Sequence, residues 1–335
     1  MIKIRDKRSI FIIFGYLALN AFIFELSLTQ KNVPFGTKNK HKSIAPDFTE
    51  IENLDYFHLR DGVPQLSLAA NKMRSQGEDF AEFDEPKGLY NYLQKDKTIR
   101  YQALEGIYKK AKEILTLDGK VKMTTDDAEY FADHFKYYFK KDLIIGKSNV
   151  KVVGDDLKTK DHFVIESETM RAYPQKQYST FKGNVHGSLV RKKNYEGGMS
   201  FSSLEMQMDG VKSLAQLQGD VMMKREGYLI TAGKGDIFLE NFNKSLKYFV
   251  FNDDVKVTET IKTPTGNTLR RAFSERLEGF AREEKMILSG APRVEMGTDV
   301  VKGYRITIRE DIDLIEVDDA MSDMQMKKKE KKEKN

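Results

Sequence analysis

The sequence predicts an all-β protein that follows one N-terminal transmembrane helix. The main observation is a phrase of residues 217–223, with apolar side chains at alternate positions around Gly219, which is the period of a strand. This phrase recurs at a nearly fixed spacing, as expected for a structural repeat. Evenly spaced short strands joined by polar turns are typical of a sandwich, a barrel or a stacked coil of sheets.

Six copies of the phrase occur between residues 117 and 294. Their leading apolar residues lie 28 to 37 residues apart, so each unit has room for more than one strand. Two copies are nearly identical to the first, one has an aspartate in place of the glycine, and two are longer. The glycine indicates a bulge or a close approach of two backbones, and an ordinary turn glycine is the alternative. The copies cover residues 117–123, 145–152, 181–185, 217–223, 251–257 and 288–294.

Further strands are expected between the copies. Residues 199–208 alternate ahead of the copy at 217, and residues 228–232 and 237–239 precede the copy at 251. Residues 99–117 would also suit a short helix, but the spacing of the apolar side chains favours two strand-like pieces kinked at Gly106. Residues 272–280 are similarly ambiguous, and their position before the last copy favours strand.

The N-terminus predicts a membrane anchor. Four basic residues within positions 3–8 precede an apolar run at residues 10–28, and nineteen helical residues span roughly 28 Å, about the thickness of a bilayer core. The basic flank is expected in the cytoplasm and the rest of the chain on the far side of the membrane. A cleavable signal peptide is the alternative, but residues 24–28 lack its small-residue site. The anchoring side chains would be Ile10, Phe14, Leu17, Phe22 and Leu28.

Composition and local pattern divide the chain into five parts. Residues 1–29 form the basic flank and anchor, and residues 30–60, rich in Lys, Asn, Pro and Asp, are expected to be a linker. Two β domains follow at 61–190 and 191–320, separated by a polar stretch near residue 191. Residues 321–335 form a charged tail that we expect to be disordered.

Nothing in the sequence predicts catalysis, a metal or a cofactor. The chain has no cysteine, which excludes disulfides and thiolate chemistry, and none of its five histidines has metal-ligand spacing to another. The Gly-Lys-Gly-Asp stretch at 233–236 lacks the residues of a phosphate loop and predicts a tight turn. Acidic pairs such as Asp253-Asp254 are typical of turns. The net charge of +5 comes largely from the chain ends, so we expect no nucleic-acid partner.

The order of the motifs resembles two related families. Behind the anchored start, Y-x-A-x-x-G-x-Y at residues 101–108 and L-x-L-x-G-x-V at 115–121 resemble the LptC family, the inner-membrane-anchored component of the lipopolysaccharide export bridge. From about residue 195 the chain is similar to the OstA-like LptA bridge proteins. The words that carry this second resemblance are at residues 217–221, 255–257, 286–294, 303–306 and 315–317.

The resemblance implies an open, twisted β-jelly roll, in two stacked or continuous units, with an apolar slot for acyl chains between its sheets. Alternation identifies candidate lining residues, for which an ordinary packed core is the alternative. The candidates are Leu117, Val121, Met123, Ile145, Val150, Val152, Phe181, Val185, Leu217, Val221, Met223, Phe251, Val255, Val257, Leu288 and Val294.

The resemblance further implies a non-catalytic periplasmic bridge component, anchored in the inner membrane by a single span, that carries lipopolysaccharide from the ABC transporter towards the outer membrane. The implied partners are lipopolysaccharide, the inner-membrane ABC transporter at the anchor, and further bridge units or the outer-membrane receptor. The last two would bind by edge-strand addition near residues 306–317. An anchored enzyme acting on envelope polysaccharide and a scaffold for envelope assembly are the alternatives.

Overall fold

The computed structural model describes most of the chain beyond residue 47. The chain divides into two compact units, Met1–Pro46 and Asp47–Asn335, and every described residue belongs to the second. The predicted anchor at residues 10–28 therefore lies outside the described residues. The described ranges are 48–60, 62–76, 79–92, 97–126, 128–155, 162–190, 198–225, 227–240, 245–263, 266–309, 314–319 and 321–323.

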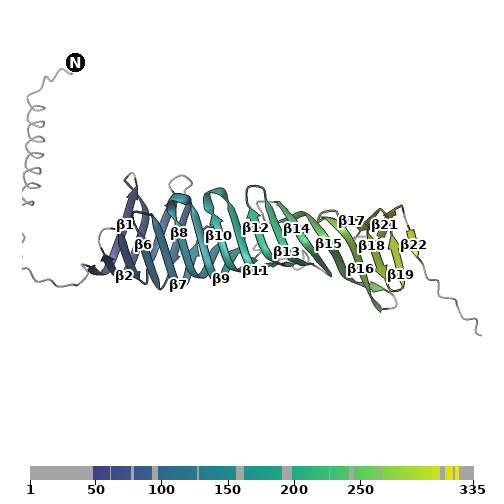
Figure 1. The fold of residues 1–335 in the computed structure, drawn as a ribbon, viewed down its shortest axis with the longest axis horizontal. Helices are drawn as coiled ribbons and strands as arrows, with labels where there is room; N and C mark the ends of the chain where they lie inside the picture. The colour runs from purple at the N-terminus through teal and green to yellow at the C-terminus, as the bar shows by residue number, and fades with distance from the viewer. Residues whose placement is uncertain are drawn as a thin grey trace, which may run out of the picture. The chain divides into compact units, whose positions relative to one another are not determined.

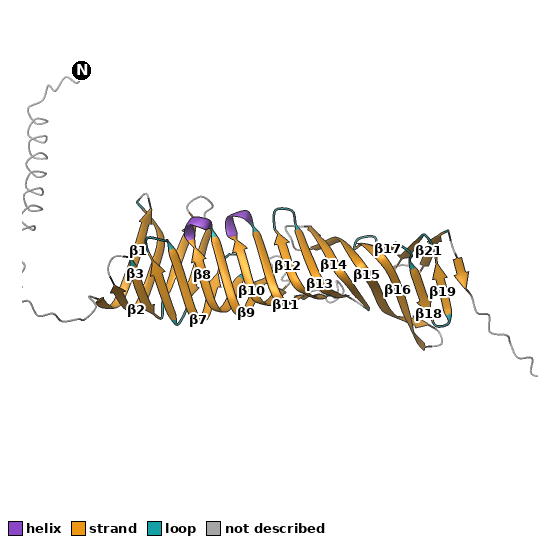
Figure 2. Ribbon diagram, in the orientation of Figure 1, coloured by secondary structure: helices purple, strands orange, loops and turns teal. Residues whose placement is uncertain are grey.

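The described part is almost entirely β-structure, as predicted (Figures 1 and 2). Two single-turn 3₁₀ helices, η2 (Phe139–Lys141) and η3 (Pro174–Lys176), interrupt the strands. The strands are β1 (Phe48–Arg60), β2 (Val63–Gln76), β3 (Phe80–Asp84), β4 (Lys87–Tyr92), β5 (Lys97–Gln102), β6 (Glu105–Lys109), β7 (Ile114–Thr124), β8 (Glu129–Tyr138), β9 (Leu143–Asp155), β10 (His162–Tyr173), β11 (Tyr178–Val190), β12 (Met199–Asp209), β13 (Leu214–Arg225), β14 (Tyr228–Glu240), β15 (Ser245–Thr263), β16 (Gly266–Phe280), β17 (Lys285–Ser289), β18 (Arg293–Met296), β19 (Asp299–Lys302), β20 (Arg305–Arg309), β21 (Leu314–Asp318) and β22 (Met321–Asp323).

The long strands form an antiparallel meander that folds into two facing layers. From β7 to β16 each strand pairs with the next, and every one of these pairings shifts register near the middle of the strands. At both ends the strands are split, because β2 pairs with both β3 and β4, and β16 with both β17 and β18. Each long strand thus contributes one half to each layer. This is the expected open β-jelly roll.

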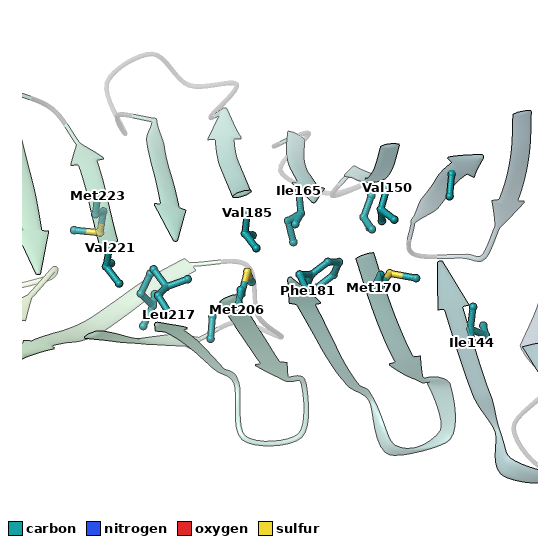
Figure 3. Close-up of a cluster of buried hydrophobic side chains, with 14 of the residues drawn as sticks. Ile144, Val150, Ile165, Met170, Phe181, Val185, Met206, Leu217, Val221 and Met223 are labelled. Atoms are coloured by element: carbon teal, nitrogen blue, oxygen red, sulfur yellow. The ribbon is translucent and has the colours of Figure 1, made fainter. Parts of the chain in front are cut away.

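We name the two layers by their short strands. Sheet I contains β3, β6, β17, β20 and β21, and sheet II contains β4, β5, β18, β19 and β22. Residues before the register shift of β7, β9, β11, β13 and β15 lie in sheet I, and those after it lie in sheet II. In the intervening strands the order is reversed, so that residues before the shift lie in sheet II and those after it lie in sheet I. Figure 3 shows side chains of the two sheets pointing towards one another.

The recurrent phrase forms the corner at which a strand passes from sheet I to sheet II. In β13, Gly219 and Asp220 both have positive φ, 77° and 47°, and the other copies have two adjacent residues in the same region. Few L-residues adopt this region, whereas glycine does so without steric cost. A Cβ on Gly219 would also lie 2.8 Å from Cδ1 of Leu204 on the neighbouring strand. The glycine is therefore needed both for its dihedral angle and for the space above it.

The intervening strands turn their corners with small buried residues. Ser167, Ser203 and Ser274 occupy these positions in β10, β12 and β16. Each hydroxyl donates a hydrogen bond of 2.9 to 3.2 Å to the backbone carbonyl two residues ahead. A side-chain donor thus serves a carbonyl at the point where the ladder of the sheet is interrupted.

Several expectations about individual segments need correction. Residues 99–117 are strands, but their break lies at Ala103 and Leu104 rather than at Gly106. Residues 272–280 are strand, as predicted, and belong to β16. The prediction of a linker to residue 60 is wrong for Phe48–Arg60, which form β1 in register with β2. The tail prediction is wrong for Met321–Asp323, which form β22.

The stretch at 233–236 is not a tight turn. It lies inside β14, where Gly233 takes part in the corner and faces Asp253 of the next strand. Lys234 forms an ion pair of 2.8 Å with Asp253. Asp253 and Asp254 likewise form the corner of β15, so this acidic pair serves a backbone role.

The corner predicts the effect of replacing its glycine. Gly219→Ala should lose about 1–2 kcal/mol through its positive φ and about 1 kcal/mol more through overlap with Leu204. Gly227→Ala is the matched control, because Gly227 has a φ of 86° but nothing within 4 Å of an added Cβ. Amide hydrogen exchange in β12 and β13 measures both effects. Equal losses in the two variants would contradict the role of the Leu204 contact.

Candidate functional site

The candidate site is the interior between sheets I and II. Fifteen of the sixteen predicted lining residues are buried there, and they belong to one hydrophobic cluster that extends from β2 to β20. Members of both sheets meet across this interior, as Figure 3 shows for Met206 and Val185. The fifteen are Leu117, Val121, Met123, Val150, Val152, Phe181, Val185, Leu217, Val221, Met223, Phe251, Val255, Val257, Leu288 and Val294.

Ile145 is the exception and lies on the outer face of β9. Its neighbour Ile144 faces the interior and is 5% exposed. The corner of this longer copy lies at Ser148 and Asn149, so the position equivalent to Leu217 is Gly146 rather than Ile145. Counting back from Val150 instead of forward from the leading isoleucine would have given the correct face.

Sequence reasoning missed the lining residues of the intervening strands. Phe135, Met170, Met206 and Ile230 are buried beside the predicted set, on β8, β10, β12 and β14. These strands lack the glycine phrase, which in the other strands shows which of the alternate residues face the interior. The ring of Phe135 explains the buried Gly146, because a Cβ there would lie 2.8 Å from its Cε1 atom.

The interior is filled by its own side chains. A cavity of about 10 Å³ lies between β4, β5, β7 and β8, and it is lined by side chains that include Ile99, Leu117 and Met123. That volume is close to the space of a single water molecule. An acyl chain could therefore occupy the interior only if side chains moved aside.

An open groove of about 640 Å³ lies at the corners of the C-terminal strands. Its lining includes Phe273, Glu275, Arg293, Lys302 and Tyr304. The Arg293 guanidinium lies 4.6 Å from the centre of the Phe273 ring. This groove has charged side chains of both signs, unlike the apolar interior.

One ion pair faces the apolar interior. Arg270 is 3% exposed and shares its face of β16 with Ala272 and Ser274. Its Nη2 and Nε atoms lie 2.7 and 3.0 Å from Oε2 of Glu259, which is opposite Arg270 on β15. A charge at such a position is tolerated only when it is paired, because burial of an unpaired charge is costly.

The buried tyrosines of the interior are neutral. Burial raises the pKa of Tyr101 and of Tyr108 above the ordinary tyrosine value. The Tyr101 hydroxyl donates a 2.9 Å hydrogen bond to the backbone carbonyl of Ser67. Tyr101 thus supplies an apolar ring to the interior while its polar end is hydrogen-bonded.

The described residues offer no group of three His, Asp or Glu side chains that could hold a metal ion. Over the same described part of the chain, no helix is long and apolar enough to cross a membrane. The described residues thus form an apolar interior with an ion pair at Arg270, and this interior suits the burial of apolar groups.

The ion pair predicts a non-additive response to substitution. Glu259→Leu alone should destabilise β15 and β16 by about 3 kcal/mol, because it removes the carboxylate beside the buried guanidinium. Adding Arg270→Met should recover part of that loss, because no charge then remains. Hydrogen exchange of β15 and β16 measures both. A double variant as unstable as the sum of the single variants would contradict the pairing.

Two family models match the chain. The model described as lipopolysaccharide-assembly, LptC-related, matches residues 12–190, and the model described as LptA/(LptD N-terminal domain) LPS transport protein matches residues 201–313. A search of curated proteins finds no match.

One solved structure similar to this chain is that of LptH from Pseudomonas aeruginosa, the LptA homologous periplasmic component of the conserved lipopolysaccharide transport device. It is 11% identical, with a TM-score of 0.35, and the match covers 38% of this chain and 95% of that chain. The first family model alone spans more than half of the sequence. The chain therefore belongs to the LptC-related family of lipopolysaccharide-assembly proteins, with an LptA-like region in the same polypeptide.

Proposed function

We propose that this chain carries lipopolysaccharide from the inner-membrane ABC transporter towards the outer membrane through the interior between sheets I and II. The family assignment makes it a component of lipopolysaccharide transport rather than an enzyme. The observation that supports a conduit is the continuity of the apolar interior from β2 to β20, across both family regions. Residues 10–28 would anchor the chain beside the transporter.

The interior suits acyl chains for a physical reason. Exposing a saturated chain to water costs about 0.8 kcal/mol per methylene group, so a mobile lipid needs an uninterrupted apolar path. Methionines are frequent along this path, and their unbranched side chains adapt to irregular shapes. Five are almost completely buried: Met123, Met170, Met206, Met223 and Met286. Displacing them would make room without opening the corners.

The ends of the sheet suit strand addition. Among the described strands, β1 pairs only with β2, β21 only with β20, and β22 only with β19. An unpaired edge binds another strand through its backbone groups. We assign the β1 edge to the transporter and the β21 and β22 edges to a further bridge unit or the outer-membrane receptor.

Photo-crosslinking in cells tests the conduit. A probe at Val221 or Val255, on the interior face, should give adducts that blot for lipopolysaccharide. Asp220 is the matched control, because it is exposed beside Val221 on the same corner. Protein adducts without lipid at both interior positions would refute the conduit and favour the scaffold.

The β1 edge predicts a different adduct. Phe57 is 57% exposed on this strand, and a probe there should capture a protein partner rather than lipid. Leu204 is the control, because it is 49% exposed but lies at a corner in the middle of the sheet. Equal protein capture at the two positions would contradict strand addition at β1.

A further inference from the structure

Aromatic rings join the two sheets near the N-terminal end of the interior. Tyr90 lies on β4 and Tyr137 on β8, with ring centres 5.1 Å apart. Phe139, in η2, lies 4.6 Å from Tyr90 in a stacked arrangement and 4.4 Å from Tyr137. The two contacts of Tyr90 bring together residues that are 47 and 49 positions apart in the sequence.

These contacts run from one sheet to the other. Tyr90 is opposite Leu66 and Ile99 in the ladders of sheet II. Tyr137 is opposite Leu115 and Ile144 in the ladders of sheet I. The long strands connect the two sheets at the corners. Away from the corners, ring contacts of this kind hold the two sheets together.

Phe139 is held in place by the turn that carries it. Its backbone N–H donates to the carbonyl of Glu113 at 3.1 Å, and the N–H of Asp142 donates to the Phe139 carbonyl. The Asp142 carboxylate accepts a 2.7 Å hydrogen bond from the backbone N–H of Gln175. Figure 2 shows η2 at the end of β8, on the margin of the sheet. The ring therefore folds inward from a turn on the edge of sheet I.

The cavity between β4, β5, β7 and β8 lies directly beside the three rings. Tyr90, Tyr137 and Phe139 form part of its lining, and the rest of the lining is apolar or aromatic. The space is too small for a methylene chain while the rings remain in contact. Its lining also includes Leu117 and Met123, which are among the first of the predicted lining residues in the chain.

We propose that Tyr90, Tyr137 and Phe139 form an aromatic clasp over an acyl-chain site, and that the clasp opens to admit one acyl chain beside Leu117. This inference rests on the proposed function, because it names where the lipid enters the interior. An inserted acyl chain keeps the ring faces buried, so only the ring–ring term is lost, and for each contact that term is no more than the burial of about two methylene groups. A chain that inserts several methylenes therefore compensates for separating the rings.

The first test locks the clasp in the full-length chain in cells. The chain has no cysteine, so Tyr90→Cys with Phe139→Cys places the only two thiols, and a reversible bifunctional methanethiosulfonate joins them. Lipopolysaccharide adducts from probes at Leu117 and Val255 should fall several-fold and return after reduction. Each single-cysteine chain, treated identically, is the control for the reagent.

The second test weakens the clasp. Phe139→Leu keeps apolar bulk but removes the stacked ring, and it should raise the adduct yield at Leu117 several-fold. Phe280→Ala is the matched control, because it removes a 5.0 Å ring contact with Tyr248 that lies within sheet I. This control should leave the yield at Leu117 unchanged.

The outcomes separate the clasp from the conduit. Unchanged adducts at Leu117 and Val255 in the locked chain would overturn the clasp while leaving the conduit in place. An increase with Phe280→Ala as large as that with Phe139→Leu would also overturn it. Absence of lipid adducts at Val221 and Val255 in the unmodified chain would overturn both proposals.

Discussion

The fold depends on the backbone at the corners, where each long strand passes from one sheet to the other. A continuous strand would leave the meander as a single layer with its apolar face in water. Two adjacent residues of positive φ, such as Gly219 and Asp220, redirect the strand within one step. The second residue is not glycine, and it adopts this positive φ at a steric cost that glycine avoids. Burial of the facing side chains in both sheets, Leu217 and Val221 in this strand, offsets that cost.

The corners also determine how far a local change spreads. Leu104 lies above Gly119 and Leu204 above Gly219, so each corner packs on the strand before it. The N–H of Leu104 donates to the carbonyls of Asp118 and Gly119, so Leu104 and the corner at Gly119 are also joined through the backbone. Stability in such a structure is close to a sum of contacts between neighbouring strands. Damage to one corner should therefore loosen its neighbours before it affects distant strands.

Alternation and spacing predicted the fold class and most of the interior, because the glycine phrase fixes the phase of every second strand. The phase failed at Ile145, where the copy is longer and Gly146 takes the interior position. It was undefined on strands such as β8, so Phe135 was missed. The strand β1 was missed because its residues 49–53 are exposed and polar residues mask its period. The contact of Tyr90 with Phe139 could not be predicted, because it depends on how distant strands are stacked.

The two family regions meet within one polypeptide, and the seam between them is ordinary antiparallel pairing. Strands β11 and β12 pair from Tyr178 with Asp209 to Leu189 with Met199, as regularly as their neighbours. Where two separate proteins meet edge to edge, the occupancy of the joint depends on how much of each is present. Here the short connection keeps the second edge at a very high effective concentration beside the first. The joint between β11 and β12 therefore stays assembled at any expression level, and its register is determined by the sequence of the single chain.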